Sequence, residues 1–282
     1  MGKFDKVLLT VDFDRTLTAP DSTIPQRNLD AIEYFMAEGG AFTINTGRST
    51  STFAKYLDTL PRNAPLLLYN GSAAYDNGKL QDLRILDMDV WETMAQMEEM
   101  FPELNLEIQG VASHYLINER PEMVALYKAL GWQHKPVKKG DDIGPFIKFA
   151  LFGQIRDTTV GHLFYGSEEE IARLDFAESE IHRLYGDKVE VYRAAPRIID
   201  VHSKGVSKLN AARDLQTKLG KEILVCVGDA ENDVTMLDGA DYAYCPADGV
   251  VASRYETVCN CADGAVADVI YKKIPEILGI SP

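Results

Sequence analysis

Cysteine is scarce in this 282-residue sequence, which has only four, Cys226, Cys245, Cys259 and Cys261. Only the last two stand close together, and a single C-x-C lacks the paired spacing that a structural zinc site requires. A zinc ribbon or zinc finger is therefore not expected. We expect these four residues to be reduced thiols in a cytoplasmic protein.

Long hydrophobic runs are also missing, and no apolar stretch approaches the length of a membrane span. The apolar run near the N-terminus, residues 7–11, is short and is followed at once by Asp12 and Asp14, which does not suit a signal peptide. Lys6 does not fit the myristoylation pattern. We see no internal repeat and no low-complexity segment. The sequence therefore predicts a cytoplasmic protein without a membrane partner.

Positive charge is in short supply, because 29 Lys and Arg face 43 Asp and Glu and give a formal net charge of −14. This excess disfavours nucleic acids and anionic membranes as main partners. It would also repel a small anionic substrate, which would need a local cation or a few convergent positive groups. The 46% hydrophobic and 26% charged residues are ordinary for a globular protein. The length suits one large domain or two of ordinary size.

Strand-like and helix-like segments alternate at both ends of the chain. The first ninety residues contain, in order, a strand at 7–11, a helix within 22–40, a strand within 41–48, a helix at about 50–60 and a strand within 65–72. We expect Thr23 and Gln26 to form a capping box at the start of the first helix. The late segments are a helix within 206–220, a strand within 222–229, a short helix within 230–240 and a strand at 242–247. Such alternation predicts a parallel sheet with helices on both faces.

The middle of the chain has a different pattern. Its short strand-like segments are 104–110, 113–119, 146–153 and 188–195, its helical segments are 121–130 and 167–185, and 137–144 is a loop. Alternation of polar and apolar residues in several of these strands suits a sheet with one solvated face. We therefore predict a core formed by residues 1–82 and 196–282, interrupted by a smaller α+β domain at 83–195.

Polar residues follow four of the predicted core strands. They are Asp12 and Asp14 after the first, Thr46, Gly47 and Arg48 after the second, Asn70 and Gly71 after the third, and Gly228, Asp229, Asn232 and Asp233 after the late strand. The carboxyl ends of parallel strands meet at one edge of a sheet, where functional groups gather. We therefore expect these residues to converge.

Several carboxylates in one crevice raise one another's pKa unless a cation lies among them. Aspartate and neutral oxygen ligands are those that Mg²⁺ prefers. One aspartate could then ligate the metal and attack phosphorus, while a second acid protonates the leaving oxygen. Thr46 could donate a hydrogen bond to a phosphoryl oxygen, and a lysine within residues 205–215 could neutralise charge.

The segments "DFDRTLT", "TGRS", "GVSKLNAARDL" and "GDAENDVTML" resemble, in order and spacing, the four motifs of the haloacid dehalogenase superfamily. The insertion between the second and third motifs, and "YNGS" at 69–72, resemble its Cof-like, subclass IIB sugar-phosphate phosphatases. The resemblance implies a Rossmann-like, three-layer α/β core with an inserted α+β cap domain that selects the leaving group. It also implies Mg²⁺-dependent hydrolysis of a small phosphomonoester, with a sugar phosphate as the leading class.

The resemblance assigns a role to each matching residue. Asp12 resembles the nucleophile that becomes phosphorylated and also ligates Mg²⁺. Asp14 resembles the general acid and later base, with its backbone carbonyl on the metal. Thr46 resembles the hydroxyl of the second motif. Lys208, rather than Lys204, resembles the lysine of the third motif.

The fourth motif implies that Asp229 ligates the metal and that Asp233 supports the metal or its waters. The residues implied to bind the phosphate are Thr46, Gly47, Arg48, Asn70, Gly71, Lys208 and Asn232. One position departs from the family, which commonly has glycine where this chain has Arg15. A non-glycine residue resists positive φ, so we expect the loop to avoid that conformation or to differ locally. Arg15 could instead reach the substrate, but a solvated surface arginine is the favoured interpretation.

The expected partner is a small phosphorylated metabolite, and the expected assembly is a monomer or small homo-oligomer. Two alternatives remain open: a phosphosugar mutase that uses the same aspartyl-phosphate, and a non-catalytic phosphometabolite-binding protein. The presence of both Asp12 and Asp14 disfavours the second. Some cap residues could meet a sugar or a second phosphate, although each alone is more often structural or solvated; they are His114, Tyr115, His162, Arg193 and Arg197.

Overall fold

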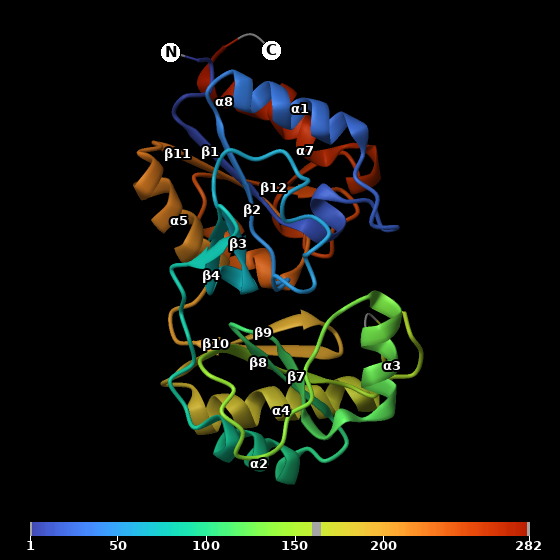
Figure 1. Ribbon diagram of the computed structural model, residues 1–282. Helices are drawn as coiled ribbons and strands as arrows, with labels where there is room; N and C mark the ends of the chain where they lie inside the picture. The colour runs from blue at the N-terminus through green and yellow to red at the C-terminus, as the bar shows by residue number, and fades with distance from the viewer. Residues whose placement is uncertain (1, 160–164, 281–282) are drawn as a thin grey trace. The chain divides into compact units, whose positions relative to one another are not determined.

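The computed structural model describes residues 2–159 and 165–280. The chain forms two compact units (Figure 1). The first unit consists of Met1–Gly47, Tyr56–Asp82 and Ser207–Pro282, and the second of Arg48–Lys55 and Leu83–Val206. Within the described residues, no helix combines the length and the hydrophobicity needed to cross a membrane.

The first unit is built on a five-stranded parallel sheet with the strand order β13-β12-β11-β1-β2. Its strands are β1 (Val7–Val11), β2 (Ala41–Ile44), β11 (Ile223–Val227), β12 (Tyr242–Pro246) and β13 (Glu256–Val258). β1 is wholly buried, as its apolar sequence predicts for a central parallel strand. Val11 lies opposite Val227 on one side and Ile44 on the other. The residues that follow these three positions therefore leave the same edge of the sheet.

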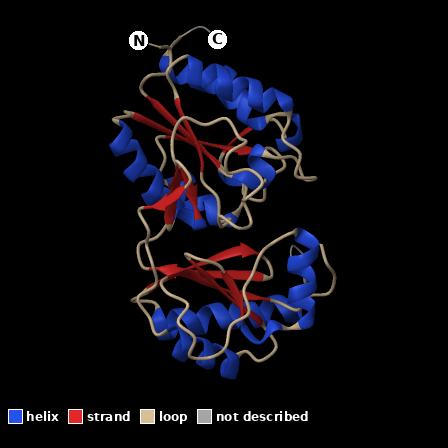
Figure 2. Cartoon of the chain, in the orientation of Figure 1, coloured by secondary structure: helices blue, strands red, loops and turns tan. Residues whose placement is uncertain are grey.

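Helices cover both faces of this sheet and make a three-layer α/β structure (Figure 2). α5 (Lys208–Leu219) and α6 (Val234–Asp238) pack on one face through residues such as Ala212 and Met236. The other face is covered by α1 (Gln26–Ala37), α7 (Ala265–Asp268) and α8 (Ile274–Leu278). The expected parallel α/β core is confirmed.

Two local predictions in the first part of the chain are wrong. α1 begins at Gln26 itself and has no capping box, because Thr23 donates its hydroxyl to Asp21 instead (2.6 Å). Residues 50–60 form turns rather than a helix. Each backbone N–H of Ser49 and Thr52 donates to the other residue's hydroxyl, at 2.9 and 3.0 Å. Such bonds compete with the hydrogen-bond pattern of a helix.

The predicted strand within residues 65–72 forms an antiparallel sheet of its own with two strands that were not predicted. These strands are β3 (Leu66–Leu68), β4 (Ala73–Asp76) and β5 (Lys79–Gln81). β3 still meets the parallel sheet, because Asn45, just after β2, forms a parallel bridge with Leu67. The segment that follows β3 therefore lies beside the end of β2.

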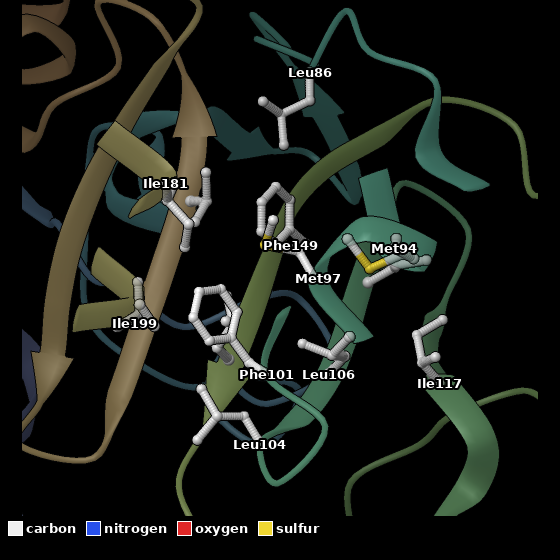
Figure 3. Close-up of a cluster of buried hydrophobic side chains, with 14 of the residues drawn as sticks. Leu86, Met94, Met97, Phe101, Leu104, Leu106, Ile117, Phe149, Ile181 and Ile199 are labelled. Atoms are coloured by element: carbon white, nitrogen blue, oxygen red, sulfur yellow. The ribbon is translucent and has the colours of Figure 1, made fainter. Parts of the chain in front are cut away.

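The second unit is an antiparallel sheet with helices on both faces. The strand order is β7-β6-β8-β10-β9, with β6 (Asn105–Gly110), β7 (His114–Leu116), β8 (Phe146–Phe152), β9 (Val189–Ala195) and β10 (Ile198–Ser203). α2 (Val90–Met100) and α4 (Glu168–Tyr185) pack against one face of this sheet and form a hydrophobic core with it. Figure 3 shows Phe149 of this core near Met97 and Ile181. α3 (Pro121–Leu130) packs on the other face through Leu126 and Tyr127. The predicted α+β insert is confirmed, although α2 and β10 were not predicted.

β10 also corrects the expected domain boundary at residue 196. It pairs with β8 and β9 of the insert, with Asp200 opposite Ala150 and Tyr192. The chain therefore returns to the first unit only after Val206. The expected solvated face of this sheet is wrong as well, because Lys148 and Asp200 are buried and form an ion pair of 2.6 Å.

Candidate active site

The residue after the central strand is held by the sheet itself. The N–H of Asp12 donates to the carbonyl oxygen of Val227 (2.8 Å), so the pairing of β1 with β11 fixes its backbone. The loop Phe13–Leu17 then buries Phe13, Thr16 and Leu17. It leaves Asp14 partly exposed, so this carboxyl group can meet a ligand from solvent.

Arg15 adopts φ 60° and ψ 10°, which is the left-handed region. The expectation that the loop would avoid this conformation is wrong. Its N–H donates to Thr18 Oγ1 (3.1 Å), which closes the turn. A side chain with a Cβ atom pays about 1–2 kcal/mol to adopt this conformation, whereas glycine adopts it readily.

Lys208 lies between acids from distant parts of the sequence. Helix α5 begins at Lys208 because Ser207 caps it, accepting the N–H of Asn210. The buried Nζ of Lys208 lies 2.5 Å from Asp12 Oδ1 and 2.6 Å from Asp233 Oδ1. One cation therefore compensates two buried carboxylates and orients both.

Asp229 and Asp233 follow β11 and are fixed by local hydrogen bonds. Asp233 Oδ2 accepts the N–H groups of Asp229 (3.0 Å) and Ala230 (3.1 Å). Thr16 donates its hydroxyl to Asp229 Oδ1 (3.1 Å), which ties this loop to the loop after β1. A Cβ on Gly228 would lie 2.6 Å from the Cβ of Asp233, so only glycine lets the two segments approach this closely.

Three carboxylates form a compact group. Asp12, Asp229 and Asp233 each offer an oxygen atom, and these oxygens lie within 4.8 Å of one another. All three residues are buried. Clustered carboxylate oxygens are hard ligands that suit Mg²⁺, so the donor set fits a divalent cation.

The pKa values of two acids show that negative charge is not fully compensated. Burial, with a contribution from repulsion by Asp233, raises the pKa of Asp12 to about 7 and that of Asp229 to about 8, despite the nearby Lys208. Burial alone would lower the pKa of Lys208, but Asp12 and Asp233 raise it above its usual value. A cation among these oxygens would relieve the repulsion.

The residues expected to bind phosphate come together beside this cluster, with one exception. The carbonyl oxygen of Thr46 accepts the N–H of Asn70 (3.0 Å), and Asn70 Oδ1 lies 3.5 Å from Asn232 Nδ2. A Cβ on Gly47 would lie 2.9 Å from Asn70 Oδ1, and one on Gly71 would lie 2.5 Å from the carbonyl oxygen of Ser207, so both glycines permit close packing.

The exception is Arg48, which belongs to the second unit. Its guanidinium donates to the carbonyl oxygen of Thr52 (3.2 Å). A contact of Arg48 with a phosphate therefore stays a prediction. Lys204 also belongs to the second unit, where it pairs with Glu190 (3.1 Å).

The candidate ligands in the insert are engaged in structural contacts. Buried His114 lies 2.7 Å from Glu107, Arg197 pairs with Glu170 (3.0 Å), and Arg193 pairs with Asp175 (2.6 Å) and Glu178 (2.7 Å). Tyr115 is buried. His162 lies outside the described residues. These ion pairs favour the structural interpretation of the histidine and both arginines.

Thr16 and Asn45 were not predicted as site residues. Buried Asn45 follows β2, and its Nδ2 donates to the carbonyl oxygen of Lys208 (2.9 Å). The same nitrogen lies 3.6 Å from Met236 Sδ in α6. Asn45 therefore connects the end of β2 to the first turn of α5. The only signal in the sequence was a polar residue at the end of a buried strand.

If Lys208 acts in phosphoryl transfer, as the resemblance implies, Asn45→Ala should lower kcat for an aryl phosphate about tenfold with little change in KM, because Asn45 orients the first turn of α5. The matched control is Asn63→Ala. Asn63 also bonds to backbone at β2, accepting the N–H of Phe42 (2.8 Å) and donating to Gly40 (2.8 Å), but at the opposite end of the strand. Equal losses of kcat in the two variants would contradict a positioning role.

The three-layer core, with carboxylates and a lysine at the ends of its central strands, defines an α/β enzyme with an inserted domain. The profile of the haloacid dehalogenase-like hydrolases matches residues 9–270. The chain belongs to this family.

The relatives have low sequence identity but cover nearly the whole chain. YbjI of Escherichia coli, named a 5-amino-6-(5-phospho-D-ribitylamino)uracil phosphatase, is 24% identical over 94% of this chain and 95% of that protein. YitU of Bacillus subtilis, with the same enzyme name, is 22% identical over 91% and 94%. The structure of BT4131, described as a subclass IIB sugar phosphatase, matches with a TM-score of 0.73 and 19% identity, covering 96% and 98%. A haloacid dehalogenase-like hydrolase from B. subtilis matches with a TM-score of 0.75 and 16% identity, covering 94% and 99%. These structural matches show a shared fold.

Proposed function

We propose that this enzyme, a phosphatase of the haloacid dehalogenase-like family, hydrolyses small phosphomonoesters through an aspartyl-phosphate on Asp12. The observation that carries the proposal is the position of Asp12. Its carboxylate follows the central strand, is bonded to Lys208 at 2.5 Å and lies beside Asp229 and Asp233. A carboxylate oriented by a buried cation is suited to attack phosphorus rather than to cap a turn.

The proposed cofactor is Mg²⁺, held by the carboxylates of Asp12 and Asp229 and by the backbone carbonyl of Asp14. Both oxygens of Asp233 already accept hydrogen bonds, one from Lys208 and one from backbone N–H groups. We therefore assign Asp233 mainly to orienting the site. When bound, Mg²⁺ would neutralise charge on the phosphoryl oxygens and the carboxylates.

In the proposed reaction, a carboxylate oxygen of Asp12 forms a bond to phosphorus as the bond from phosphorus to the leaving oxygen breaks. Asp14, which is partly exposed, donates its proton to that oxygen. Asp14 then takes a proton from the water that hydrolyses the aspartyl-phosphate. Thr46, Asn70, Asn232 and the backbone at Gly47 and Gly71 are the proposed phosphate donors.

The proposed substrate class is a sugar or sugar-alcohol phosphate. The names of YbjI and YitU and the description of BT4131 support this class. The test is a panel of such phosphates with purified protein, with and without Mg²⁺ and with EDTA. We expect release of inorganic phosphate that requires the metal. Turnover in EDTA would contradict the metal assignment, and rearrangement without phosphate release would indicate a mutase. The monomeric or small oligomeric state and the cytoplasmic location stay predictions.

We expect Asp14→Asn to slow hydrolysis most for poor leaving groups. Acidic phenols leave without protonation, so a series of aryl phosphates should show a loss that grows as the phenol becomes less acidic, reaching about 10²–10⁴-fold, the usual size of general acid catalysis. The slope of log kcat/KM against phenol pKa measures the effect. A uniform loss across the series would contradict the acid role of Asp14.

We also expect stability to depend on pH in a way that Mg²⁺ suppresses. Because the folded-state pKa values of Asp12 and Asp229 (about 7 and about 8) exceed the ordinary aspartate value of 3.8, their contribution to stability is full below about pH 4 and is lost as the pH rises through 7 and 8. At about pH 8.5, Mg²⁺ should raise the unfolding temperature by at least about 3 °C, which corresponds to about 1 kcal/mol. At about pH 5.5 the effect should be smaller.

Thermal unfolding with Mg²⁺ or EDTA measures this difference. The double variant Asp12→Asn/Asp229→Asn is the control and should lose most of the pH dependence. Stabilisation by Mg²⁺ that is equal at both pH values would contradict the prediction.

A further inference from the structure

Arg15 differs from every other arginine of the chain. Among the described residues, no ion pair or hydrogen bond engages its guanidinium. Each of the others binds a carboxylate or a backbone carbonyl through its guanidinium; those others are Arg27, Arg48, Arg62, Arg84, Arg120, Arg156, Arg173, Arg183, Arg193, Arg197, Arg213 and Arg254. Arg15 is therefore an exposed cation without a carboxylate partner among the described residues, and its charge acts on the nearby thiol of Cys261. The chain as a whole nevertheless carries a large excess of acids.

The backbone makes this choice of residue costly. Arg15 lies in the left-handed region, where glycine would avoid the strain described above. The turn around it is anchored, because Phe13, Thr16 and Leu17 are buried. Strained backbone positions cluster at functional sites. An arginine at such a position in an anchored turn therefore indicates a functional role for its side chain.

The charges near Arg15 indicate what it can bind. It stands directly after Asp14, the proposed donor to the leaving oxygen, and directly before Thr16, which bonds Asp229. Lys208 is fully engaged with two carboxylates and is not available to a second anion. Arg15 is thus the cation of this loop that is available to bind an anionic part of the leaving group, rather than the transferred phosphoryl group.

We propose that Arg15 binds a second anionic group on the substrate, a carboxylate or a second phosphate carried by the leaving group. This inference rests on the proposed function and narrows its substrate class to phosphomonoesters with a further negative charge. The planar guanidinium can donate two parallel hydrogen bonds to such a group. The interaction discriminates between substrates and takes no part in bond breaking.

Two matched pairs of substrates test the proposal. The pair 3-phosphoglycerate and glycerol 3-phosphate differs in one carboxylate, and the pair fructose 1,6-bisphosphate and fructose 1-phosphate differs in one phosphate. We expect the wild-type enzyme to prefer the more anionic member of at least one pair by about tenfold in kcat/KM, the value of one charge-assisted hydrogen bond. The pair that shows the preference identifies the anionic group.

Arg15→Gly should remove this preference, mainly through KM, and should raise the unfolding temperature by relieving the strain. Arg15→Lys should keep part of the preference. Two controls test whether the loss of any exposed positive charge, or the relief of any positive φ, changes the substrate preference. Arg183→Ala removes an exposed cation from α4, and Asn77→Gly relieves a positive φ of 49° in the β4–β5 turn. Neither should change the preference.

The proposal is overturned if the wild-type enzyme favours neither anionic member, or if Arg15→Gly keeps the ratio within about twofold. Equal losses for both members of a pair would also overturn it. If the wild-type protein hydrolyses no phosphomonoester, the proposed function fails separately. Calorimetric affinities of the wild-type and Arg15→Gly proteins for both members of each substrate pair then decide the role of Arg15, and equal ratios in both pairs would reject it.

Discussion

The Asp12→Asn protein should fold normally and hydrolyse p-nitrophenyl phosphate at least about 10⁴-fold more slowly than the wild-type enzyme, as the loss of a nucleophile does. Asparagine has nearly the same shape, and its amide oxygen can still accept the hydrogen bond of Lys208. It removes the charge that burial and neighbouring acids oppose, so stability without metal should not fall at neutral pH. The measurements are kcat/KM with Mg²⁺ and thermal unfolding.

A matched control for this variant is Asp30→Asn, which changes an exposed aspartate on α1. It should have near-normal activity. Mass spectrometry of the Asp12→Asn protein should accompany the assay, since deamidation would regenerate aspartate. Near-normal turnover by an intact, folded Asp12→Asn protein would reject the nucleophile assignment and, with it, the aspartyl-phosphate.

The largest loss of stability is expected for Lys208→Met. This variant leaves Asp12 and Asp233 buried without their cation, and breaking a buried ion pair from one side costs about 3–5 kcal/mol. Urea unfolding at about pH 8 in EDTA measures the loss. Activity should fall to the background level, because Lys208 also orients Asp12, the proposed nucleophile.

Two further variants control this experiment. Lys218→Met breaks the Lys218–Asp82 ion pair, which also measures 2.6 Å but is exposed, and should cost less than about 1 kcal/mol. The double variant Asp12→Asn/Lys208→Met should recover part of the lost stability, because one uncompensated charge is gone. A Lys208→Met protein as stable as the Lys218→Met protein would contradict the buried triad.

The parts of the site that could be predicted from residue patterns are those determined by strand ends, whereas Lys208 was predicted from the resemblance to the third motif. Asp12 and Asp229 each follow an apolar run, and a parallel sheet carries such residues to one edge whatever the length of chain between them. Asn45 and Thr16 could not be found this way, because their importance lies in partners 163 and 213 residues away. Hydrogen bonds between such distant residues leave no local pattern.

The fold of the insert was harder to predict because its sheet buries charges. Lys148 and Asp200 alternate with apolar neighbours, which is the pattern of a solvated face, yet they pair with each other in the interior. β10 was not predicted as a strand because it contains polar residues such as Asp200 and His202, which are buried. In the segment 50–60, the helical pattern was overridden by hydroxyl groups that bond to the backbone.

The central position of β1 has a consequence for protein synthesis. One of its two neighbours, β11, is encoded more than two hundred residues later, beyond the entire insert. While the ribosome is still making the insert, one edge of β1 has no partner strand, and an open apolar edge invites pairing with other chains. We therefore expect the nascent N-terminal segment to depend on rapid completion of the polypeptide, or on a chaperone, until β11 emerges and Asp12 meets Lys208.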